Sequence, residues 1–450
     1  MLACLCAPIC AHANALGLME VVEAALQSDS TYQAAIDDAN VNRKNLPIAR
    51  AIFLPQLSMS LSQGKSSFDR EFSSATGPRS DSTRQDTRNN VLQLRQTLFN
   101  LDAVARYRQA ELQGGIAEQS LRKEQQDLFL RVATAYVEVL AAHDARQLAR
   151  AEQDALTEQA ANAESGFARG ELAVTDAKEA RARADIAAVR TIETQALLDA
   201  ALSNLEMISG LNVWALSSIN RRFEWNGVVK EDFEVWRDMA AQFNPELQVA
   251  YRAIEFFERE VDKQRAGHAP RLDWVASKVQ SQSDSVNTIG IKSDVNAVSL
   301  QLQVPLFSGF AVNYSVEQAY DRLSKSRNEK DATFKRISTD LFKQYNTARL
   351  AGSKLAALDK AVGSAQASVA SARLGIKTGL RLTLDLLNAQ QKLFQTRLEY
   401  SRAYYESVLA LLRLRAGTGV LNKTDLGELA VVFSDEAGVV QLKSAVVEVR

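Results

Sequence analysis

The chain lacks most of the residues from which metal centres and catalytic sites are built. Its only cysteines are Cys4, Cys6 and Cys10, so no disulfide and no thiolate metal site is expected beyond residue 15. His143 and His268 are isolated from each other, and no phosphate-binding glycine loop occurs. A formal net charge of −1 does not suit a dedicated nucleic-acid binder. We therefore expect no enzyme, no cofactor, no bound metal and no nucleic-acid partner.

Long apolar runs are also missing. No stretch approaches the roughly 18 to 20 consecutive apolar residues that a membrane-spanning helix needs, so any crossing of a membrane would be made by strands. The first fifteen residues are apolar and end in Ala-Asn-Ala, the small-x-small pattern of a signal-peptidase site. The usual basic region before them is absent. Two explanations remain: the start methionine lies inside a longer signal peptide, or the segment is a disordered tail. We expect a signal peptide over residues 1–15.

Glycine and proline are scarce, and one glycine motif occurs twice. Residues 166–176 and 375–385 both read Gly, three residues, Gly, five residues, Asp, at an offset of 209 residues. Each copy interrupts a long proline-free run of helix-forming residues. Glycine can end one helix, and the Thr and Asp that follow suit the first turn of the next. Each motif is therefore expected to be a helical hairpin tip in a duplicated chain, with Gly166, Gly170, Gly375 and Gly379 at the tips.

The duplication predicts the same order of helices and strands in both halves of the chain. Helical patterns run from Leu18 to about Phe53, with Pro47 expected to kink the helix or end it early, and from about Phe233 to Arg265. Repeat 1 (16–210) then has strands at about 55–64 and 90–99, a long helix at about 100–164 and a return helix at 172–208. A connector (211–233) leads to repeat 2 (234–417), with strands at about 270–280 and 296–306 and helices at about 309–374 and 380–416. Long polar loops are expected at 64–88 and roughly 281–295, and residues 418–450 form a peripheral segment.

The expected strands are apolar on one side and polar on the other. Leu57, Met59 and Leu61 alternate with serines, and Leu300 and Leu302 flank Gln301. About ten residues is the length at which a tilted strand crosses an outer membrane. Four strands cannot close a barrel, and open edges are not tolerated in lipid, so other copies must complete it. Three protomers would supply twelve strands and a ring of roughly 23 Å backbone diameter.

This order of elements resembles the TolC family of outer-membrane efflux and type I secretion proteins over about residues 18–417. The most specific marks are the paired tips, Pro55 and Pro270 at the strand openings, and the strand-to-helix step at 304–309. The resemblance implies a mainly helical homotrimer with a twelve-stranded membrane β-barrel continued by a long α-helical barrel. It also implies a passive channel-tunnel in the outer membrane that extends into the periplasm. Its partners would be a periplasmic adaptor (membrane fusion protein) and an inner-membrane ABC or proton-driven transporter.

The resemblance also implies an iris-like periplasmic gate. Thr175 and Asp176 match the family's acceptors on the first tip, and Arg381 matches the arginine that reaches them. Asp385 matches the first of two aspartates that ring the narrowest point, whereas Asn388 replaces the second. Ile376 stands where a gate tyrosine often occurs. The sequence is therefore compatible with a gate closed by polar contacts and with one closed by apolar packing. Independently of any gate, Asp176 and Asp385 suit helix N-termini, where a carboxylate contributes about 0.3–1 kcal/mol.

Two other classes of protein fit less well. A soluble periplasmic coiled-coil adaptor would normally carry one hairpin flanked by small β-rich domains, and not two repeats with strands of membrane-spanning length. An enzyme would need a constellation of reactive side chains that this sequence does not display. The cargo, whether protein, drug or metal ion, is not specified by the sequence, because in a passive duct the selection belongs to the partner pump.

Overall fold

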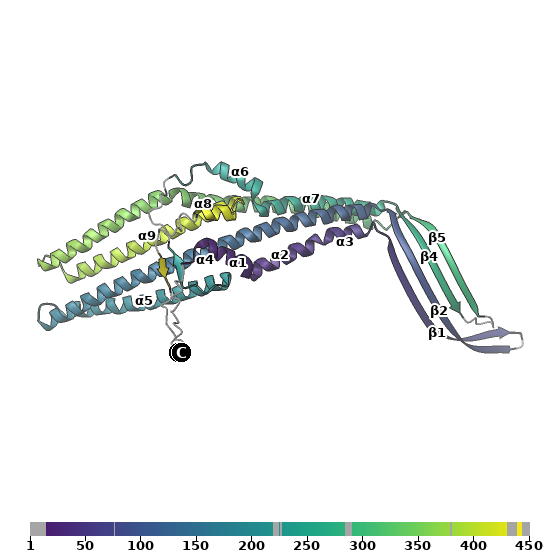
Figure 1. Ribbon diagram of the computed structural model, residues 1–450, viewed down its shortest axis with the longest axis horizontal. Helices are drawn as coiled ribbons and strands as arrows, with labels where there is room; N and C mark the ends of the chain where they lie inside the picture. The colour runs from purple at the N-terminus through teal and green to yellow at the C-terminus, as the bar shows by residue number, and fades with distance from the viewer. Residues whose placement is uncertain are drawn as a thin grey trace, which may run out of the picture. The chain divides into compact units, whose positions relative to one another are not determined.

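The computed structural model describes residues 15–75, 77–218, 225, 227–283, 290–378, 380–429 and 439–442 (Figure 1). Gly379 and all of the expected signal peptide except Ala15 lie outside these ranges. The chain divides into two compact units. Unit 1 holds Met1–Asp37, Gln119–Gln248 and Ala332–Arg450, and unit 2 holds Asp38–Glu118 and Val249–Asp331. Each unit therefore takes segments from both sequence repeats.

Unit 2 contains a four-stranded antiparallel sheet in the order β1-β2-β4-β5 (Figure 1). The strands are β1 (Gln56–Ser74), β2 (Gly77–Phe99), β4 (Arg271–Ser283) and β5 (Ile291–Gln303). Leu57 pairs with Leu94, which pairs with Ala276, which pairs with Val298, so the apolar sides of all four strands share one face. This face is open: Leu57 is 68% exposed and Leu300 is 65% exposed. Such exposure of large apolar side chains marks a surface that water does not normally cover.

The prediction of a polar loop over residues 64–88 is wrong. Strands β1 and β2 pair without interruption from Gln56↔Arg95 to Ser74↔Gly77, and β2 also pairs with β4 as far as Thr87↔Ser283. Residues 65–74 and 77–86 thus form a two-stranded ribbon beyond the four-stranded sheet (Figure 1). Backbone pairing needs no apolar side chains, so a ribbon that is exposed on both faces has no alternating pattern to reveal it. Likewise, strand occupies both ends of the expected loop at 281–295, and residues 284–289 lie outside the described part.

The helices before the sheet are more broken than their apolar pattern predicts. Three helices cover the first segment: α1 (Leu18–Ser28), α2 (Ser30–Arg43) and α3 (Asn45–Ala51), with Pro47 in the first turn of α3. The single helix expected over 233–265 is α6 (Phe233–Phe243) and α7 (Pro245–Arg265), followed by the 3-10 turn η1 (Ala266–His268). Proline is favoured at the first position of a helix, because its missing N–H would have no partner there anyway.

Long helices make up most of unit 1. Helices α4 (Leu101–Ala168) and α5 (Val174–Ser209) form one hairpin, and α8 (Ala311–Lys377) and α9 (Thr383–Thr418) form the other (Figure 1). Both α4 and α8 begin in unit 2. Within the described residues, no helix combines the length and apolar character needed to span a membrane. The apolar surface is instead used in packing around Tyr136, which is fully buried; its hydroxyl donates to the Ser217 carbonyl at 2.7 Å.

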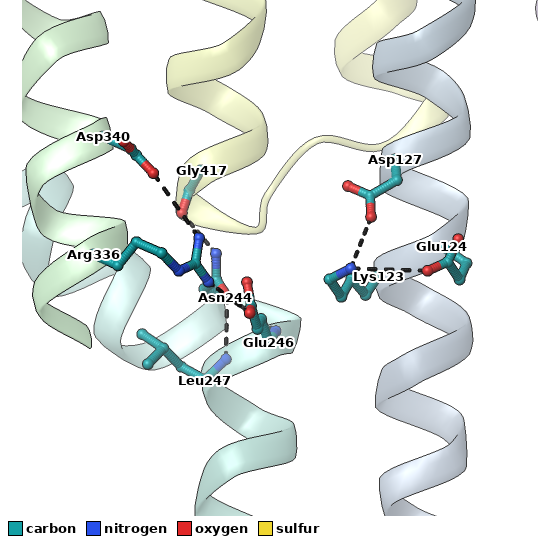
Figure 2. A network of polar contacts seen from close by, with 9 residues as sticks. All are labelled: Lys123, Glu124, Asp127, Asn244, Glu246, Leu247, Arg336, Asp340 and Gly417. Atoms are coloured by element: carbon teal, nitrogen blue, oxygen red, sulfur yellow. Dashed lines mark hydrogen bonds and ion pairs between the residues drawn. The ribbon is translucent and has the colours of Figure 1, made fainter. Parts of the chain in front are cut away.

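The junction of α6 and α7 is held by Asn244 (Figure 2). The side-chain oxygen of Asn244 accepts the N–H groups of Glu246 at 3.0 Å and Leu247 at 3.2 Å, which caps α7. Its amide nitrogen donates to the Gly417 carbonyl at 2.9 Å, and Arg336 of α8 pairs with Glu246 at 2.6 Å. The polar contacts in Figure 2 therefore tie α6, α7, α8 and the end of α9 together.

The first repeat has an equivalent junction. Asp29 accepts the Tyr32 N–H at 2.7 Å where α1 meets α2, and Arg131 of α4 lies 3.0 Å from the same carboxylate. In each repeat, the side chain that caps the second of two short helices thus also contacts a long helix. The C-terminal segment, expected to be peripheral, includes α10 (Lys423–Leu429) and β6 (Val439–Gln441), which pairs with β3 (Ala215–Ser217) of the connector. Most of residues 430–450 lie outside the described ranges.

Candidate functional site at the hairpin tips

The two hairpin tips in unit 1 are closed by equivalent backbone hydrogen bonds. At the first tip the Glu171 N–H bonds to the Gly166 carbonyl at 2.9 Å, and at the second the Leu380 N–H bonds to the Gly375 carbonyl at 2.8 Å. Gly170 lies in the left-handed region, with φ of +75°. Such a turn, closed by a hydrogen bond back to the last helical residues, ends an α-helix and favours glycine. Gly379, the counterpart of Gly170, lies outside the described residues.

The side chain six residues after the first glycine covers that glycine at each tip. A Cβ atom on Gly166 would lie 2.9 Å from Cδ1 of Leu172, and a Cβ atom on Gly375 would lie 2.8 Å from Cγ of Arg381. Glycine at both positions therefore lets these side chains lie directly against the turn. Leu172 packs against the apolar seam between α4 and α5, whereas Arg381 is exposed. The same turn thus presents an apolar side chain in one repeat and a cation in the other.

The acidic site residues lie in the first turns of the return helices. Asp176 is half-buried in the first turn of α5, next to the exposed Thr175. The Asp385 carboxylate accepts the Leu382 N–H at 3.3 Å at the start of α9. Asp385 therefore caps its own helix, as its position in the sequence indicates. Within one chain, no hydrogen bond or ion pair joins Arg381 to Thr175 or Asp176 among the residues described here.

The fifth site residue, Asn388, takes part in a contact that sequence reasoning missed. Nη1 of Arg183 in α5 donates to the side-chain oxygen of Asn388 in α9 at 2.9 Å, and Nη2 of Arg183 pairs with Glu179 at 2.7 Å. Only the i, i+4 spacing of Glu179 and Arg183 is visible in the sequence. The link from Arg183 to Asn388 spans 205 positions and depends on the packing of the two hairpins.

An apolar seam lies beneath this link. Leu387, which precedes Asn388 and is 1% exposed, packs against small residues where α4 meets α5. The seam comprises Leu156, Ala160, Ala163, Ala177, Ala180, Ala184 and Ala187. Alanine lets two helices approach closely and leaves few bulky side chains to interlock. Among the described residues near the tips, Leu387 and the contact from Arg183 to Asn388 hold the second hairpin on the first.

Farther from the tips, polar contacts form both within the first hairpin and between the two hairpins. Nη1 of Arg190 in α5 lies 2.8 Å and 3.0 Å from the two carboxylate oxygens of Glu152 in α4, which is itself buried. Tyr405 of α9 donates to Asp144 of α4 at 2.7 Å. Buried pairs of this kind are costly to break, because each partner would be left unsatisfied. Away from the tips, the contact of Tyr405 with Asp144 thus joins the second hairpin to the first.

His143 is a titratable group on α4 that lies largely buried. It is 8% exposed in α4, and burial lowers its pKa from the usual value. The neighbouring Asp144 raises the pKa and Arg146 lowers it, and neither outweighs burial. Among the described residues, no group of three or more His, Cys, Asp or Glu side chains is placed to hold a metal ion.

The chain has clear relatives. A family model described as "Outer membrane efflux protein" matches residues 21–211 and 236–420, one segment in each repeat. The alkaline protease secretion protein AprF of Pseudomonas aeruginosa is 34% identical over 94% of this chain and 88% of its own length. The proteases secretion protein PrtF of Dickeya chrysanthemi is 32% identical over 94% of this chain and 92% of its own length.

Solved structures share the fold at lower sequence identity. The CmeC outer membrane channel of Campylobacter jejuni superposes with a TM-score of 0.75 over 93% of this chain and 90% of its own, at 13% identity. This likeness and the family match confirm the expected fold class. The chain therefore belongs to the outer membrane efflux protein family, a family of outer-membrane channels and not of enzymes.

Proposed function

We propose that three copies of this chain form a passive duct through the outer membrane. The duct would receive an exported protein from a periplasmic adaptor and an inner-membrane transporter. The observation that carries the proposal is the four-stranded sheet, in which one face is apolar and exposed and β1 and β5 are edge strands. The chain itself would act by providing a path and not by catalysis.

Closure by neighbouring copies follows from the physics of strand edges. In lipid, an unpaired N–H or C=O costs several kcal/mol, so an open four-stranded sheet cannot remain in a bilayer. Pairing β5 of one copy with β1 of the next satisfies both edges, and repetition closes a ring. Three copies give about twelve strands, which leaves space for an aqueous lumen. A soluble adaptor would have no use for an exposed apolar face of this kind.

The relatives favour protein as cargo. AprF and PrtF are both named for the secretion of proteases, and each aligns with nearly all of this chain. A duct that passes a polypeptide needs an aqueous lumen. The polar face of β5 fits this need, since it carries Gln303, Gln301 and Ser299 opposite Leu302 and Leu300. Drug efflux is the second candidate, because the family model that matches the chain is described as an outer membrane efflux protein.

The gate is proposed at the hairpin tips. In this proposal Arg381 of one copy bonds Thr175 and Asp176 of its neighbour, and Asp385 contributes to an acidic ring at the narrowest point. The exposed guanidinium of Arg381 and the absence of a partner for it within the described part of its own chain support a contact with another copy. The contact between Arg183 and Asn388 would hold the two hairpins of one copy together while the gate is closed.

Two measurements test the proposal. Extracted in mild detergent, the full chain should have the mass of a trimer, whereas a stable monomer in detergent-free buffer contradicts the closed sheet. For cargo, cells that lack their own outer-membrane component would receive this chain together with its cognate adaptor and transporter. Appearance of a protease in the medium supports protein export. Restored drug resistance without secretion would favour efflux instead.

A further inference from the structure

The polar face of the sheet, opposite its apolar face, carries almost no charge. Where all four strands pair, the side chains on this face are mainly serine, glutamine, threonine, asparagine and small apolar residues. The ionisable side chains on this face of the described four-stranded part are Arg95 of β2 and Arg271 and Asp273 of β4. All three lie near the helices, since β2 ends at Phe99 and β4 begins at Arg271. The charge of this face is therefore gathered at one end.

Asp273 holds both arginines through one oxygen. Its Oδ2 lies 2.9 Å from Nε of Arg271 and 3.4 Å from Nε of Arg95, and its side chain is 5% exposed. Its Oδ1 is buried and has no hydrogen-bond partner among the described residues. The side chains of Arg95 and Arg271 are both partly exposed. The carboxylate is thus a buried anchor for two cations that reach the surface of the polar face.

The two arginines have more donors and more positive charge than Asp273 can satisfy. Two guanidiniums carry about ten N–H donors, and one carboxylate offers about four acceptor positions. In register, Asp273 lies between Thr97 and Gln301, and Arg271 lies beside Gln303, so these paired neighbours are uncharged. Within the described part of the chain, no second acid pairs with either arginine. Each copy thus keeps one unit of positive charge and unused N–H donors, which suit a further carboxylate.

These charges lie at the level of the apolar band on every strand. The residues next to them on the opposite face are apolar: Leu57 on β1, Leu94 on β2, Leu272 and Trp274 on β4, and Leu300 and Leu302 on β5. Because that face meets lipid in the proposed duct, the two arginines can be approached only from the lumen. Cations at membrane depth are costly, and those that are retained face a water-filled path for ions or substrates.

Three copies in the proposed duct would arrange these charges as a ring. The backbone of a twelve-stranded barrel has a radius of roughly 12 Å, close to the Debye length of about 10 Å at 0.1 M ionic strength, so the charge acts across the whole lumen. A chain with several carboxylates can contact more than one copy at once, which a free anion cannot do. Resting on the proposed duct, we propose that Arg95 and Arg271, held by Asp273, bind the carboxylates of an acidic polypeptide as it passes.

The test uses the full chain in planar bilayers, with poly-L-glutamate as the probe. Added on the side of the strand hairpins, the probe reaches the ring without passing the tips of the helical hairpins. It should reduce the current at a total glutamate concentration at least about tenfold below that at which free glutamate does so, because several contacts form on one chain. Equal block by free glutamate would make the ring a site for small anions and overturn the assignment to a polypeptide. Failure to form channels at all would instead contradict the duct.

Two variants on β2 locate the contact. Arg95→Gln removes one guanidinium from each copy and should raise the half-blocking concentration of poly-L-glutamate about tenfold or more. Arg88→Gln is the matched control, since it removes the same charge from the opposite face of the same strand. The control should be blocked as the unmodified chain is. An unchanged half-blocking concentration in Arg95→Gln, or an equal rise in Arg88→Gln, would overturn the proposal.

A variant of Asp273 separates binding from a purely structural role. Asp273→Asn and Arg95→Gln both break the same ion pair, so a role in stability alone would shift the block in the same direction. Because Asp273→Asn removes the negative charge and keeps both cations, it should lower the half-blocking concentration. Arg95→Lys keeps the charge without the planar fork, so its block should be intermediate between those of the unmodified chain and Arg95→Gln. A rise in Asp273→Asn like that in Arg95→Gln would overturn the assignment.

Discussion

Arg183 of α5 donates a hydrogen bond to the side-chain oxygen of Asn388 in α9, 2.9 Å away, and so joins two hairpins whose tips are far apart in the sequence. The contact lies one residue from Leu387, the leucine that seats α9 on the alanine seam. Because it is partly exposed to water, its contribution is modest, about 0.5–1 kcal/mol per chain. A gate that must open benefits from contacts of this strength.

The first prediction concerns this contact. Arg183→Ala should raise the conductance of the protein in planar bilayers, because it releases α9 from α5 near the tips. Asn388→Asp should lower the conductance, since it replaces a hydrogen bond with an ion pair to the same guanidinium. Opposite shifts in the two variants are the expected result. A change of the same sign in both would contradict a holding role for the contact.

The second prediction concerns the proposed contact between copies. If Arg381 bonds Thr175 and Asp176 of a neighbour, each seam gains about 1.5–3 kcal/mol, and three symmetry copies multiply the effect. Arg381→Ser should then raise single-channel conductance. Leu172→Ser is the matched variant at the equivalent position of the first tip. It removes no polar contact, so it should not raise the conductance in the way that Arg381→Ser does. Unchanged conductance in Arg381→Ser would favour closure by apolar packing around Ile376.

The third prediction separates the two roles of Asp385. Asp385→Asn keeps an oxygen that accepts the Leu382 N–H but removes the charge, whereas Asp385→Ala removes both. Block of the channel by multivalent cations from the periplasmic side should weaken in both variants. The melting temperature should fall only in Asp385→Ala, in line with a cap worth about 1 kcal/mol. Retention of full cation block in Asp385→Asn would exclude Asp385 from the narrowest ring.

The fourth prediction tests which face of β5 meets lipid. Leu300→Arg places a charge on the apolar face and should cost about 2–4 kcal/mol near the membrane midplane. Gln301→Arg places the same charge one residue away on the polar face and should insert normally. Insertion is measured by the amount of protein recovered in the outer-membrane fraction. Equal recovery of the two variants would mean that the assignment of faces is wrong.

The fifth prediction is a pH dependence of stability at His143. Because burial lowers its pKa in the folded protein, the unfolded chain binds a proton first as the pH falls. Stability should therefore be unaffected at pH values well above about 6.5 and should decline as the pH falls below it. His143→Gln should flatten this decline in melting temperature, and His268→Gln, at an exposed position, should not. A decline that persists unchanged in His143→Gln would assign it to other groups.

Much of this architecture can be predicted from the sequence alone because it is encoded in local periods. The paired glycine motifs at 166–176 and 375–385 mark where the helices end, and the alternation at Leu300, Gln301 and Leu302 defines the two faces of a strand. The family match confirms the fold class, the outer-membrane location and the channel function expected from these marks. Periodicity shows which side of a helix or strand is apolar. This is sufficient to predict the element and its orientation where one side is buried or meets lipid.

Only the tertiary structure decided those features that no repeating pattern of apolar residues along the chain encodes. The ribbon at 65–74 and 77–86 is mostly polar, and the break at Asn244 depends on a side chain that reaches Gly417 of another helix. The contact from Arg183 to Asn388 and the contrast between Leu172 and Arg381 over equivalent glycines depend on the packing of one hairpin on the other. The sequence by itself determined the long helices, the two-sided strands next to them and the apolar sides of both. The polar contacts between elements were decided by packing, because they join residues whose spacing along the chain carries no signal.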